Sequence, residues 1–420
     1  MNSTTPELLA PAGGWPQLRA ALQAGADAVF FGAGKLNMRA RAKNFSVEEL
    51  PEVCNLCQQS GAKAYLTLNT LVYESELSEL ETVVSAAKSA GVDAVIAADF
   101  AVIRAAARHE LPVHISTQMS VSNSETLRLF MEMGIRRVVL ARECSLEDIR
   151  QMQIALGSRA SELSLEVFAH GAMCVAVSGR CFLSGFDSGR SASRGECAQP
   201  CRQEYRIQSP RGGEGFSISG SHLLSPKDLC TLPFLEQLLD AGVSSLKIEG
   251  RNRSPDYVLT VVSVYREALD FYQSNRGEEN FLSEFEHLKT RGMEKLEKVY
   301  HRGFSEGFYM GKPLGDWSTP PGNQSSCQRE YIGQILRCVD GETEVQLRLE
   351  SSSLQEGEDV FSESPEQGFQ AWSVSGMKLG GRPCSEAPKG SLITLPRQPF
   401  MHQGQRTYRQ KLRLMALHGN

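Results

Sequence analysis

The feature that most constrains the fold is a pattern that recurs from Leu8 to Gly250. In each repeat a helix with one apolar face ends near a glycine, and a short apolar strand follows within a few residues. Glycine suits the end of a helix because the left-handed backbone needed there costs it little. The glycines at this position are Gly25, Gly61, Gly91, Gly134 and Gly242. The pattern predicts alternating helices and strands along this part of the chain.

Eight segments of this region are predicted strands. Their nearly continuous apolar character is typical of parallel strands that are covered on both faces. They are Leu8–Ala12, Ala28–Gly32, Ala64–Asn69, Ala94–Asp99, Val113–Thr117, Arg137–Arg142, Leu165–Gly171 and Ser245–Gly250. Eight strand–helix units predict an α/β fold with a TIM-type (β/α)8 barrel. An open doubly wound sheet is the alternative, but the sequence has neither a dinucleotide fingerprint nor a Walker loop.

The connection between the last two predicted strands is unusually long and spans residues 171–244. Loops that follow barrel strands lie on the C-terminal face, where catalytic residues gather. We therefore expect residues 1–310 to form the barrel and its following helices, with this insertion over the active-site face. Residues 311–328, rich in Pro, Gly and Ser, are a predicted linker. Residues 329–420, with period-two alternation, predict a small β-barrel domain with a basic tail. The basic residues of the tail are Arg406, Arg409, Lys411 and Arg413.

Four cysteines lie inside the long insertion. They are Cys174, Cys181, Cys197 and Cys201. Thiolates are soft ligands that suit iron–sulfur clusters or zinc. Structural zinc sites more often use two tight cysteine pairs, whereas only the last two cysteines are close in this sequence. We therefore expect a 4Fe-4S cluster on these four side chains. Zinc and unligated thiols are the alternatives, and Cys230 is an alternative to Cys201 as the fourth ligand.

Polar residues at corresponding places end six of the predicted strands. They are Asn69, Asp99, Gln118, Arg142, His170 and Glu249. Because the C-terminal ends of barrel strands face one mouth, we expect at least three of them to line one pocket. All of these except Arg142 are candidate catalytic residues, and His170 is a candidate for proton transfer. A structural role is the alternative for each residue taken alone.

Four arginines lie in the loops after the second and the last predicted strands. They are Arg39, Arg41, Arg251 and Arg253. A guanidinium offers a planar pair of donors that suits a carboxylate or a phosphate. We therefore predict that these arginines, together with Arg142, bind a small anionic ligand. For Arg251 and Arg253 the alternative is an ion pair with Glu249.

Composition narrows the protein class. The 420-residue chain is 41% hydrophobic and 22% charged, and its formal net charge of −5 argues against a surface coated with positive charge. No apolar run reaches the ~18–20 residues that a membrane span needs, and the sequence does not start with a secretion signal. We expect a cytoplasmic protein that does not associate with membranes. In that compartment the eleven cysteines favour metal ligation, catalysis or scattered core thiols over disulfides.

Several segments resemble peptidase family U32. The stretch Glu166–Ser184 (EVFAHGAMCVAVSGRCFLS) is similar to the signature of that family. Further similar stretches are RGECAQPCR (Arg194–Arg202), SPKDL (Ser225–Leu229) and KIEGRNRSPDYV (Lys247–Val258). The resemblance covers essentially the whole chain, including the predicted C-terminal β-domain.

The resemblance implies a function other than the proteolysis in the family name. The sequence has neither an H-E-x-x-H zinc motif nor a nucleophile elbow. Better-understood relatives are oxygen-independent hydroxylases with iron–sulfur clusters, and they act on tRNA uridine, ribosomal RNA cytidine or ubiquinone precursors. The resemblance implies tRNA as substrate, 5-hydroxylation of the wobble uridine as reaction and prephenate as co-substrate, and it leaves the electron donor open. The alternatives are a collagenase-like peptidase, a hydroxylase of ribosomal RNA or ubiquinone precursors, and a non-catalytic RNA-binding protein.

Overall fold

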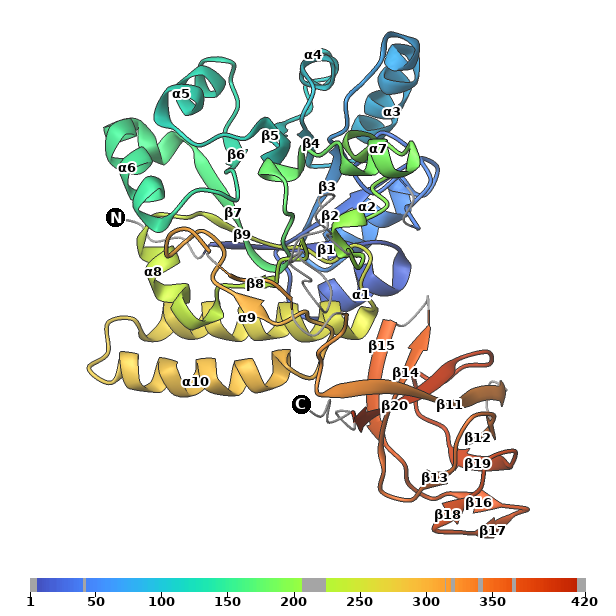
Figure 1. Cartoon of the computed structure of the whole chain (residues 1–420). Coiled ribbons are helices and arrows are strands. Elements are labelled where there is room, and N and C mark those ends of the chain that lie inside the picture. Colours follow the sequence, from blue (N-terminus) through green and yellow to red (C-terminus); the bar gives the residue numbers. More distant parts are fainter. Residues whose placement is uncertain are drawn as a thin grey trace, which may run out of the picture.

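The first part of the chain is a closed ring of eight parallel strands, which confirms the predicted TIM-type barrel (Figure 1). The computed structural model describes residues 6–40, 43–205, 224–313, 315–318, 322–338, 343–364 and 368–413. The ring strands are β1 (Glu7–Ala12), β2 (Ala28–Gly32), β3 (Lys63–Leu68), β4 (Ala94–Ala97), β5 (Val113–Ile115), β6 (Arg137–Val139), β7 (Ser164–Ala172) and β9 (Ser245–Ile248). Strand β9 pairs in parallel with both β1 and β7, so the sheet is closed and not an open doubly wound one.

Helices follow the strands and surround the ring (Figure 1). They are α1 (Trp15–Gln23), α2 (Leu50–Gln59), α3 (Leu77–Ser89), α4 (Phe100–Arg108), α5 (Ser124–Glu132), α6 (Leu146–Leu156), α7 (Leu183–Ser188), α8 (Leu235–Asp240), α9 (Pro255–Asn275) and α10 (Phe281–Leu296). The five glycines expected to end helices all have positive φ, between 73° and 87°. Within the part of the chain that the structure describes, no helix is both long and apolar enough to cross a membrane.

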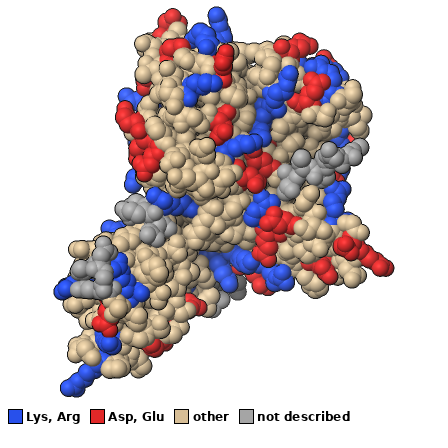
Figure 2. All heavy atoms as spheres, turned by 180° about the vertical axis from the view of Figure 1, so that it is seen from behind, with Lys and Arg blue, Asp and Glu red and all other residues tan. Residues whose placement is uncertain are grey.

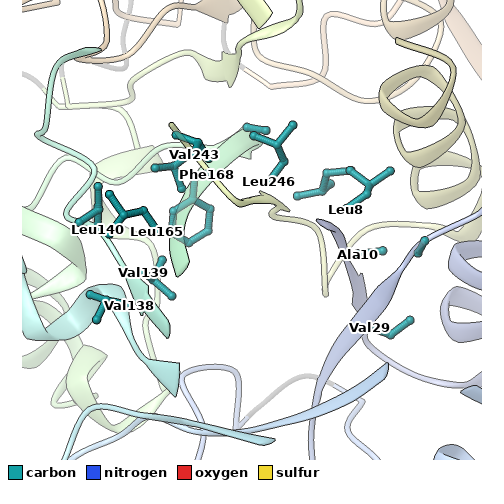
Figure 3. Close-up of a cluster of buried hydrophobic side chains, with 14 of the residues drawn as sticks. Leu8, Ala10, Val29, Val138, Val139, Leu140, Leu165, Phe168, Val243 and Leu246 are labelled. Atoms are coloured by element: carbon teal, nitrogen blue, oxygen red, sulfur yellow. The ribbon is translucent and has the colours of Figure 1, made fainter. Parts of the chain in front are cut away.

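Apolar side chains form one layer inside the ring and a larger layer between the strands and the helices. Inside the ring, Leu9, Phe30 and Ile96 pack together. Their chain neighbours point outward, because side chains alternate along a strand, and Leu8 and Val29 belong to the outer layer (Figure 3). Burial of each large apolar side chain contributes about 1.5–3 kcal/mol. The two layers hold the strand ends on which the site is built.

Strand β7 continues past the ring and carries the insertion. Its first residues pair in parallel with β9, and its last residues pair antiparallel with β8 (Asp228–Cys230), where Ala172 lies opposite Asp228. A register shift lies between Phe168 and His170 in the pairing with β9, and His170 pairs with both β9 and β8. Such an irregularity redirects the side chains that follow it. The small extra sheet is completed by β10 (Phe304–Ser305), which pairs with β8.

The C-terminal part is an antiparallel β-domain, as the period-two alternation predicts. Its main sheet has the order β15–β14–β20–β11–β12–β19–β16–β17. These strands are β11 (Cys327–Arg337), β12 (Glu344–Leu349), β14 (Asp359–Ser364), β15 (Gly368–Ser373), β16 (Lys378–Leu379), β17 (Arg382–Pro383), β19 (Leu392–Pro396) and β20 (Arg406–Leu412). A short pair, β13 (Leu354–Gln355) and β18 (Glu386–Ala387), lies beside them. The alternating Val345, Leu347 and Leu349 are buried in the domain core.

The predicted basic tail is part of the sheet of the β-domain as far as Leu412, and the described residues end at 413. Its residues form β20, which lies inside the sheet between β14 and β11. Arg409 pairs with Glu330 and Glu358, each at 2.7 Å, so neighbouring carboxylates neutralise its charge. Arg413 donates to the carbonyl oxygen of Asn323. Residues 414–420 lie outside the described part of the chain.

The β-domain contacts the barrel through one bridging arginine and strand β15. Arg329 pairs with Asp256 of α9 at 2.9 Å and with Glu363 of β14 at 2.5 Å, and β15 packs against α1 and α9. On the face drawn in Figure 2, acidic and basic side chains are interspersed over both parts. That distribution agrees with the small net charge of the sequence.

Candidate active site at the mouth of the barrel

A cavity of about 210 Å³ lies at the C-terminal ends of the barrel strands. The four predicted cluster ligands, named here the four cavity cysteines, all line it: Cys174, Cys181, Cys197 and Cys201. Four of the six polar residues expected at strand ends line it as well: Asn69, Gln118, Arg142 and Glu249. The structure therefore brings the thiols of the insertion and the polar strand ends into one site.

The first half of the insertion has a strained backbone that a carboxylate holds in place. Ser178 has a φ of 42°, a left-handed value that is uncommon for a residue with a Cβ. Its backbone N–H and its hydroxyl donate to the Glu143 carboxylate at 2.7 and 2.6 Å. Arg180 donates from Nε to the carbonyl oxygen of Gln118 at 2.8 Å. These bonds tie residues 174–181 to the loops after β5 and β6, and strain of this kind is common at functional sites.

The second half of the insertion packs on the loop after β2. A Cβ on Gly195 would lie 2.1 Å from the carbonyl oxygen of Asn37, and the φ of Gly195 is 77°, so the contact requires glycine. The buried hydroxyl of Ser184 accepts a hydrogen bond from the backbone N–H of Ala198 at 2.8 Å. This bond joins α7 to the turn that begins at Cys197.

Arg202 anchors the last cavity cysteine to the barrel. Its guanidinium donates to the carbonyl oxygen of Met173 at 2.7 Å and to the hydroxyl of Ser225 at 2.6 Å. Because Met173 precedes Cys174 and Arg202 follows Cys201, this guanidinium links the first and the last of the four cavity cysteines. Burial lowers the pKa of Arg202, and the nearby Arg302 lowers it further.

The cavity thiols are free and close enough to influence each other. Burial raises the pKa of Cys201, Arg202 opposes that rise, and the other three cavity cysteines add to it. The backbone N–H of Gln199 donates to Sγ of Cys197 at 3.4 Å, a bond of the kind that tunes cluster sulfurs. Among the described residues, no three Cys, His, Asp or Glu side chains are grouped for one metal ion. The four cavity cysteines offer soft thiolate ligands of the kind that iron–sulfur clusters or zinc take.

The alternative fourth ligand, Cys230, lies away from the cavity. It is buried, with its Sγ 3.9 Å from the hydroxyl of Tyr265 and 3.7 Å from the sulfur of Met293. It belongs to the hydrophobic core between the strands and the helices. Of the two candidates for the fourth position, Cys201 is the one that shares the cavity with the other three cysteines.

Three arginines surround Glu249 in the cavity. They are Arg39, Arg142 and Arg251, and together they are called the arginine cluster. Arg39 pairs with Glu249 at 2.9 Å. Burial alone would raise the pKa of Glu249, but the three arginines outweigh burial and lower it to about 2. Glu249 is therefore an anion at neutral pH. Three guanidiniums around one carboxylate leave this wall with excess positive charge.

Arg251 is buried without a direct carboxylate partner in the described residues. Its side chain is 5% exposed, and its Nη1 donates to Oδ1 of Asn37 at 3.1 Å and to Oγ1 of Thr67 at 3.0 Å. Its Nε is buried and has no hydrogen-bond partner. Burial lowers the pKa of Arg251 to about 9. A buried cation with an unused donor is suited to an anionic ligand.

The other predicted anion-binding arginines differ in how far they are already engaged. Arg142 donates to the carbonyl oxygen of Ala172 at 2.6 Å, and its guanidinium lies 3.8 Å from the ring centre of Phe168. Arg253 lines the cavity but lies 3.7 Å from the carboxylate of Asp228 and 3.6 Å from the ring centre of Tyr300. Arg41 lies outside the described residues.

Amide and hydroxyl side chains form a hydrogen-bonded trio on the cavity wall. The Gln118 side-chain oxygen accepts from the hydroxyl of Ser116 at 2.5 Å and from the amide of Asn69 at 3.3 Å. The Asn69 oxygen accepts from the backbone N–H of Met38 at 3.1 Å. Because the trio is anchored to the backbone, it presents donors and acceptors at fixed places in the cavity.

Two of the candidate catalytic residues do not line the cavity. Asp99 caps α4 by accepting from the backbone N–H of Ala101 at 2.8 Å, and its other oxygen accepts from Val72 at 3.0 Å. His170 follows the register shift in β7 and packs between the rings of Tyr265 and Phe304. Burial lowers the pKa of His170 to about 3, so the imidazole is neutral. The expectation that these two side chains face the mouth is therefore corrected.

Several of the residues that line the cavity were not predicted from the sequence. Thr67 and Ser116 line the wall two residues before Asn69 and Gln118, where the two-residue period of the strands could have revealed them. Arg302 also lines the cavity. It comes from beyond α10 and reaches the mouth only because β10 pairs with β8, a long-range pairing with no local sequence signal.

Comparison with known proteins shows one family. Residues 13–319 match the family model described as Peptidase family U32. The chain is 35% identical to a protein named collagenase from Porphyromonas gingivalis over 416 residues, 97% of this chain and 99% of that protein. It is 35% identical to tRNA hydroxylation protein P1 of Bacillus subtilis over 367 residues, 86% of this chain and 84% of that protein. It is also 35% identical to a 23S rRNA 5-hydroxycytidine synthase of Escherichia coli over 315 residues, 74% of this chain and 46% of that protein.

Proposed function

Because the chain belongs to peptidase family U32, we propose that it is an oxygen-independent RNA hydroxylase of the cytoplasm. The proposed reaction is 5-hydroxylation of the wobble uridine of tRNA. Relatives named for tRNA hydroxylation and for 5-hydroxycytidine synthesis in ribosomal RNA support RNA as the substrate class. The choice of tRNA rests on tRNA hydroxylation protein P1, because the match to this chain covers 84% of that protein's length.

The observation that carries the proposal is the presence of four thiols and an excess of guanidiniums in one cavity. A peptidase needs an activated nucleophile or a metal-activated water. No histidine is found among the described residues that line this cavity, and its carboxylate, Glu249, is held as an anion by arginines. The arrangement suits redox chemistry beside a bound anion better than peptide hydrolysis.

In this proposal the four cavity cysteines hold a 4Fe-4S cluster, which supplies electron transfer at the site. The bonds of Ser178, Ser184 and Arg202 position the cysteine segments and would help to place the four thiols around a cluster. The strained backbone at Ser178 is held by Glu143 for the same purpose.

The arginine cluster would bind the co-substrate, for which we propose prephenate. Prephenate carries two carboxylates, and the cluster has more guanidiniums than carboxylates to neutralise. Arg251 offers its unpaired Nε, and Arg142 offers a guanidinium that no carboxylate of the described residues pairs with. Each bond from a guanidinium to a carboxylate is charge-assisted and therefore strong.

Asn69 and Gln118 would contact the target base. Enzymes that act on a base extrude it into a pocket and read its Watson–Crick edge by hydrogen bonds. The two amides face the cavity and are held by Ser116 and by the backbone of Met38. Fixed amides can match the alternating donors and acceptors of a uracil edge.

Mass spectrometry of tRNA nucleosides tests the proposal. Deletion of the gene should remove 5-hydroxyuridine and its derivatives, the wild-type gene should restore them, and a Cys174→Ser gene should not. Ribosomal RNA from the same cells is analysed in parallel. A change confined to cytidine of ribosomal RNA would show that ribosomal RNA is the substrate instead of tRNA. Unchanged nucleosides in both RNAs, in cells without a second copy of the gene, would reject the hydroxylase function. If the protein then still binds tRNA, it is a non-catalytic RNA-binding protein.

A peptidase is the second candidate, because a relative named collagenase matches 97% of the chain. Such an activity should survive the removal of iron and of prephenate. Cleavage of gelatin by pure protein, equal in iron-loaded and iron-free preparations and unchanged by Cys174→Ser, would support it. Absence of cleavage together with a hydroxylated nucleoside would reject it.

A further inference from the structure

Two phenylalanines, one at the N-cap of α7 and one within the helix, are exposed beside the cavity. Phe186 and Phe182 are 90% and 80% exposed, more than any other large apolar side chain in the described part of the chain. They are four residues apart, so they lie on one side of the helical turn, and their ring centres are 6.4 Å apart. Adjacent exposed aromatic rings are costly in water, and apolar groups of this kind mark binding surfaces.

The aromatic pair is carried by a firmly positioned segment. Between the two phenylalanines, Ser184 is buried and its hydroxyl accepts from the backbone of Ala198. The hydroxyl of Ser188 donates back to the carbonyl oxygen of Ser184 at 2.9 Å. The rings are therefore presented outward by a held backbone.

The pair adjoins the cavity and unpaired positive charge. Cys181, Leu183 and Ser184, which flank or separate the two rings in sequence, line the cavity. Arg180 and Arg190 are exposed on either side of the pair in sequence. Arg180 donates to the carbonyl oxygen of Gln118, and neither arginine forms an ion pair with a carboxylate of the described residues. Two flat apolar rings and two guanidiniums without a carboxylate partner therefore occur in the segment that borders the cavity, where the backbone N–H of Arg190 donates to the carbonyl oxygen of Ser184.

We propose that Phe182 and Phe186 form a stacking platform for unpaired bases of the RNA substrate next to the base that enters the cavity. The inference rests on the proposed function and adds the site where the strand is held. Single-stranded RNA is bound by aromatic side chains on which bases stack and by cations along its backbone. The aromatic pair and the two arginines supply both. A duplex keeps its bases stacked on each other and offers the rings no free face.

Binding of a single-stranded oligoribonucleotide and of a duplex of equal length to the full-length protein tests the platform. A double variant, Phe182→Ala with Phe186→Ala, should bind the single strand at least about tenfold more weakly, since stacking changes affinity by roughly five- to hundredfold per base. Duplex binding should change little. Ile154→Ala on α6, 69% exposed and equally apolar, is the matched control and should bind like wild type.

Two further variants separate stacking from simple apolar contact. Leucine at both positions keeps an apolar surface but removes the flat ring, so it should resemble the alanine variant. A single Phe186→Trp variant should bind at least as well as wild type, and its added fluorescence should be quenched by the single strand. Since exposed substitutions change stability by only about ±0.5 kcal/mol, unfolding midpoints should stay equal.

The outcomes distinguish failure of the platform from failure of the proposed function. If RNA is hydroxylated but the alanine variant binds and turns over RNA like wild type, the platform is rejected alone. If the leucine variant binds like wild type, stacking is rejected. If RNA binding is unchanged but turnover with a reducing protein partner falls, the surface binds that protein and the inference is overturned. If the alanine variant loses affinity for single-stranded RNA but deletion of the gene changes no nucleoside, the platform is supported and only the hydroxylase function is rejected.

Discussion

Replacing Arg251 with methionine should weaken the binding of an anionic co-substrate while the barrel stays folded. Arg251 is 5% exposed, and its Nε has no partner. A hydrogen bond to a charged group contributes about 1.5–3 kcal/mol. At about 1.4 kcal/mol per tenfold, the KM for prephenate should rise roughly 10- to 150-fold.

The same substitution should have little effect on the free energy of unfolding. The two acceptors of Arg251 each keep another bond: Asn37 Oδ1 accepts from the backbone of Arg39 at 3.0 Å, and Thr67 Oγ1 donates to the carbonyl oxygen of Phe31 at 2.8 Å. Burial lowers the pKa of Arg251, so the fold bears a desolvation cost for this cation that methionine removes. Methionine also removes the attraction between Arg251 and Glu249, which opposes this gain, so we expect a net change of no more than about 1 kcal/mol in unfolding free energy.

The assay is hydroxylation of tRNA at varied prephenate, with urea unfolding of the same preparations. Arg251→Lys keeps the charge but loses the planar pair of donors, so its KM should be intermediate. Arg253→Met is the matched control, because Asp228 and Tyr300 already engage that guanidinium, and its KM should rise less. An unchanged KM in Arg251→Met, with a clear loss of stability, would show that the residue is structural and refute the reasoning.

Three further predictions concern the cluster, the acid response and the domain contact. Serine at each of the four cavity cysteines should remove the visible absorption and the iron of anaerobically purified protein, about four irons per chain, whereas Cys230→Ser should keep both; stoichiometric zinc without iron would contradict this. The pKa of Glu249 is about 2 in the folded protein and about 4.3 when unfolded, so Glu249 stabilises the fold above the higher value and this contribution is lost as pH falls toward the lower. Glu249→Gln should therefore be less stable than wild type at neutral pH, and the gap in urea unfolding should narrow below about pH 4.3; a constant gap would argue against it. Arg329→Met should lower stability by about 2 kcal/mol, because Asp256 and Glu363 lose their shared cation, and proteolysis near residues 313–327 should accelerate; an unchanged cleavage rate would show that β15 alone holds the domain.

Local sequence signals predicted the barrel because each strand and each helix end carries its own information. They also predicted which residues lie near the mouth, since strand ends of a barrel meet there. They could not tell where Asp99 and His170 point. Asp99 follows a strand but also precedes α4, and capping that helix takes its side chain. His170 would share the face of Phe168 by simple alternation, but the register shift in β7 turns it toward α9.

The C-terminal strand shows a different limit. A run of basic residues near the end of a chain resembles a solvated tail, and only pairing with β11 and β14 makes it an inner strand. The carboxylates that neutralise Arg409 come from β11 and from residue 358, far away in sequence. Arg302 reaches the cavity by a pairing of the same long-range kind. Such contacts are set by tertiary structure, and no local period encodes them.

The pairing of Ala172 with Asp228 affects how this family can change. The two residues stand opposite each other on adjacent strands, so the barrel itself brings together the ends of the segment between them. The entropic cost of closing a flexible loop grows slowly, by about 0.6 kcal/mol for each doubling of its length. A change in the length of this segment should therefore cost little additional loop-closure entropy. Transplanting the corresponding segment of a relative between these two residues would transfer the cysteines and the aromatic pair as one unit and leave the arginine cluster behind, so the proposed RNA platform and the proposed co-substrate site could change separately.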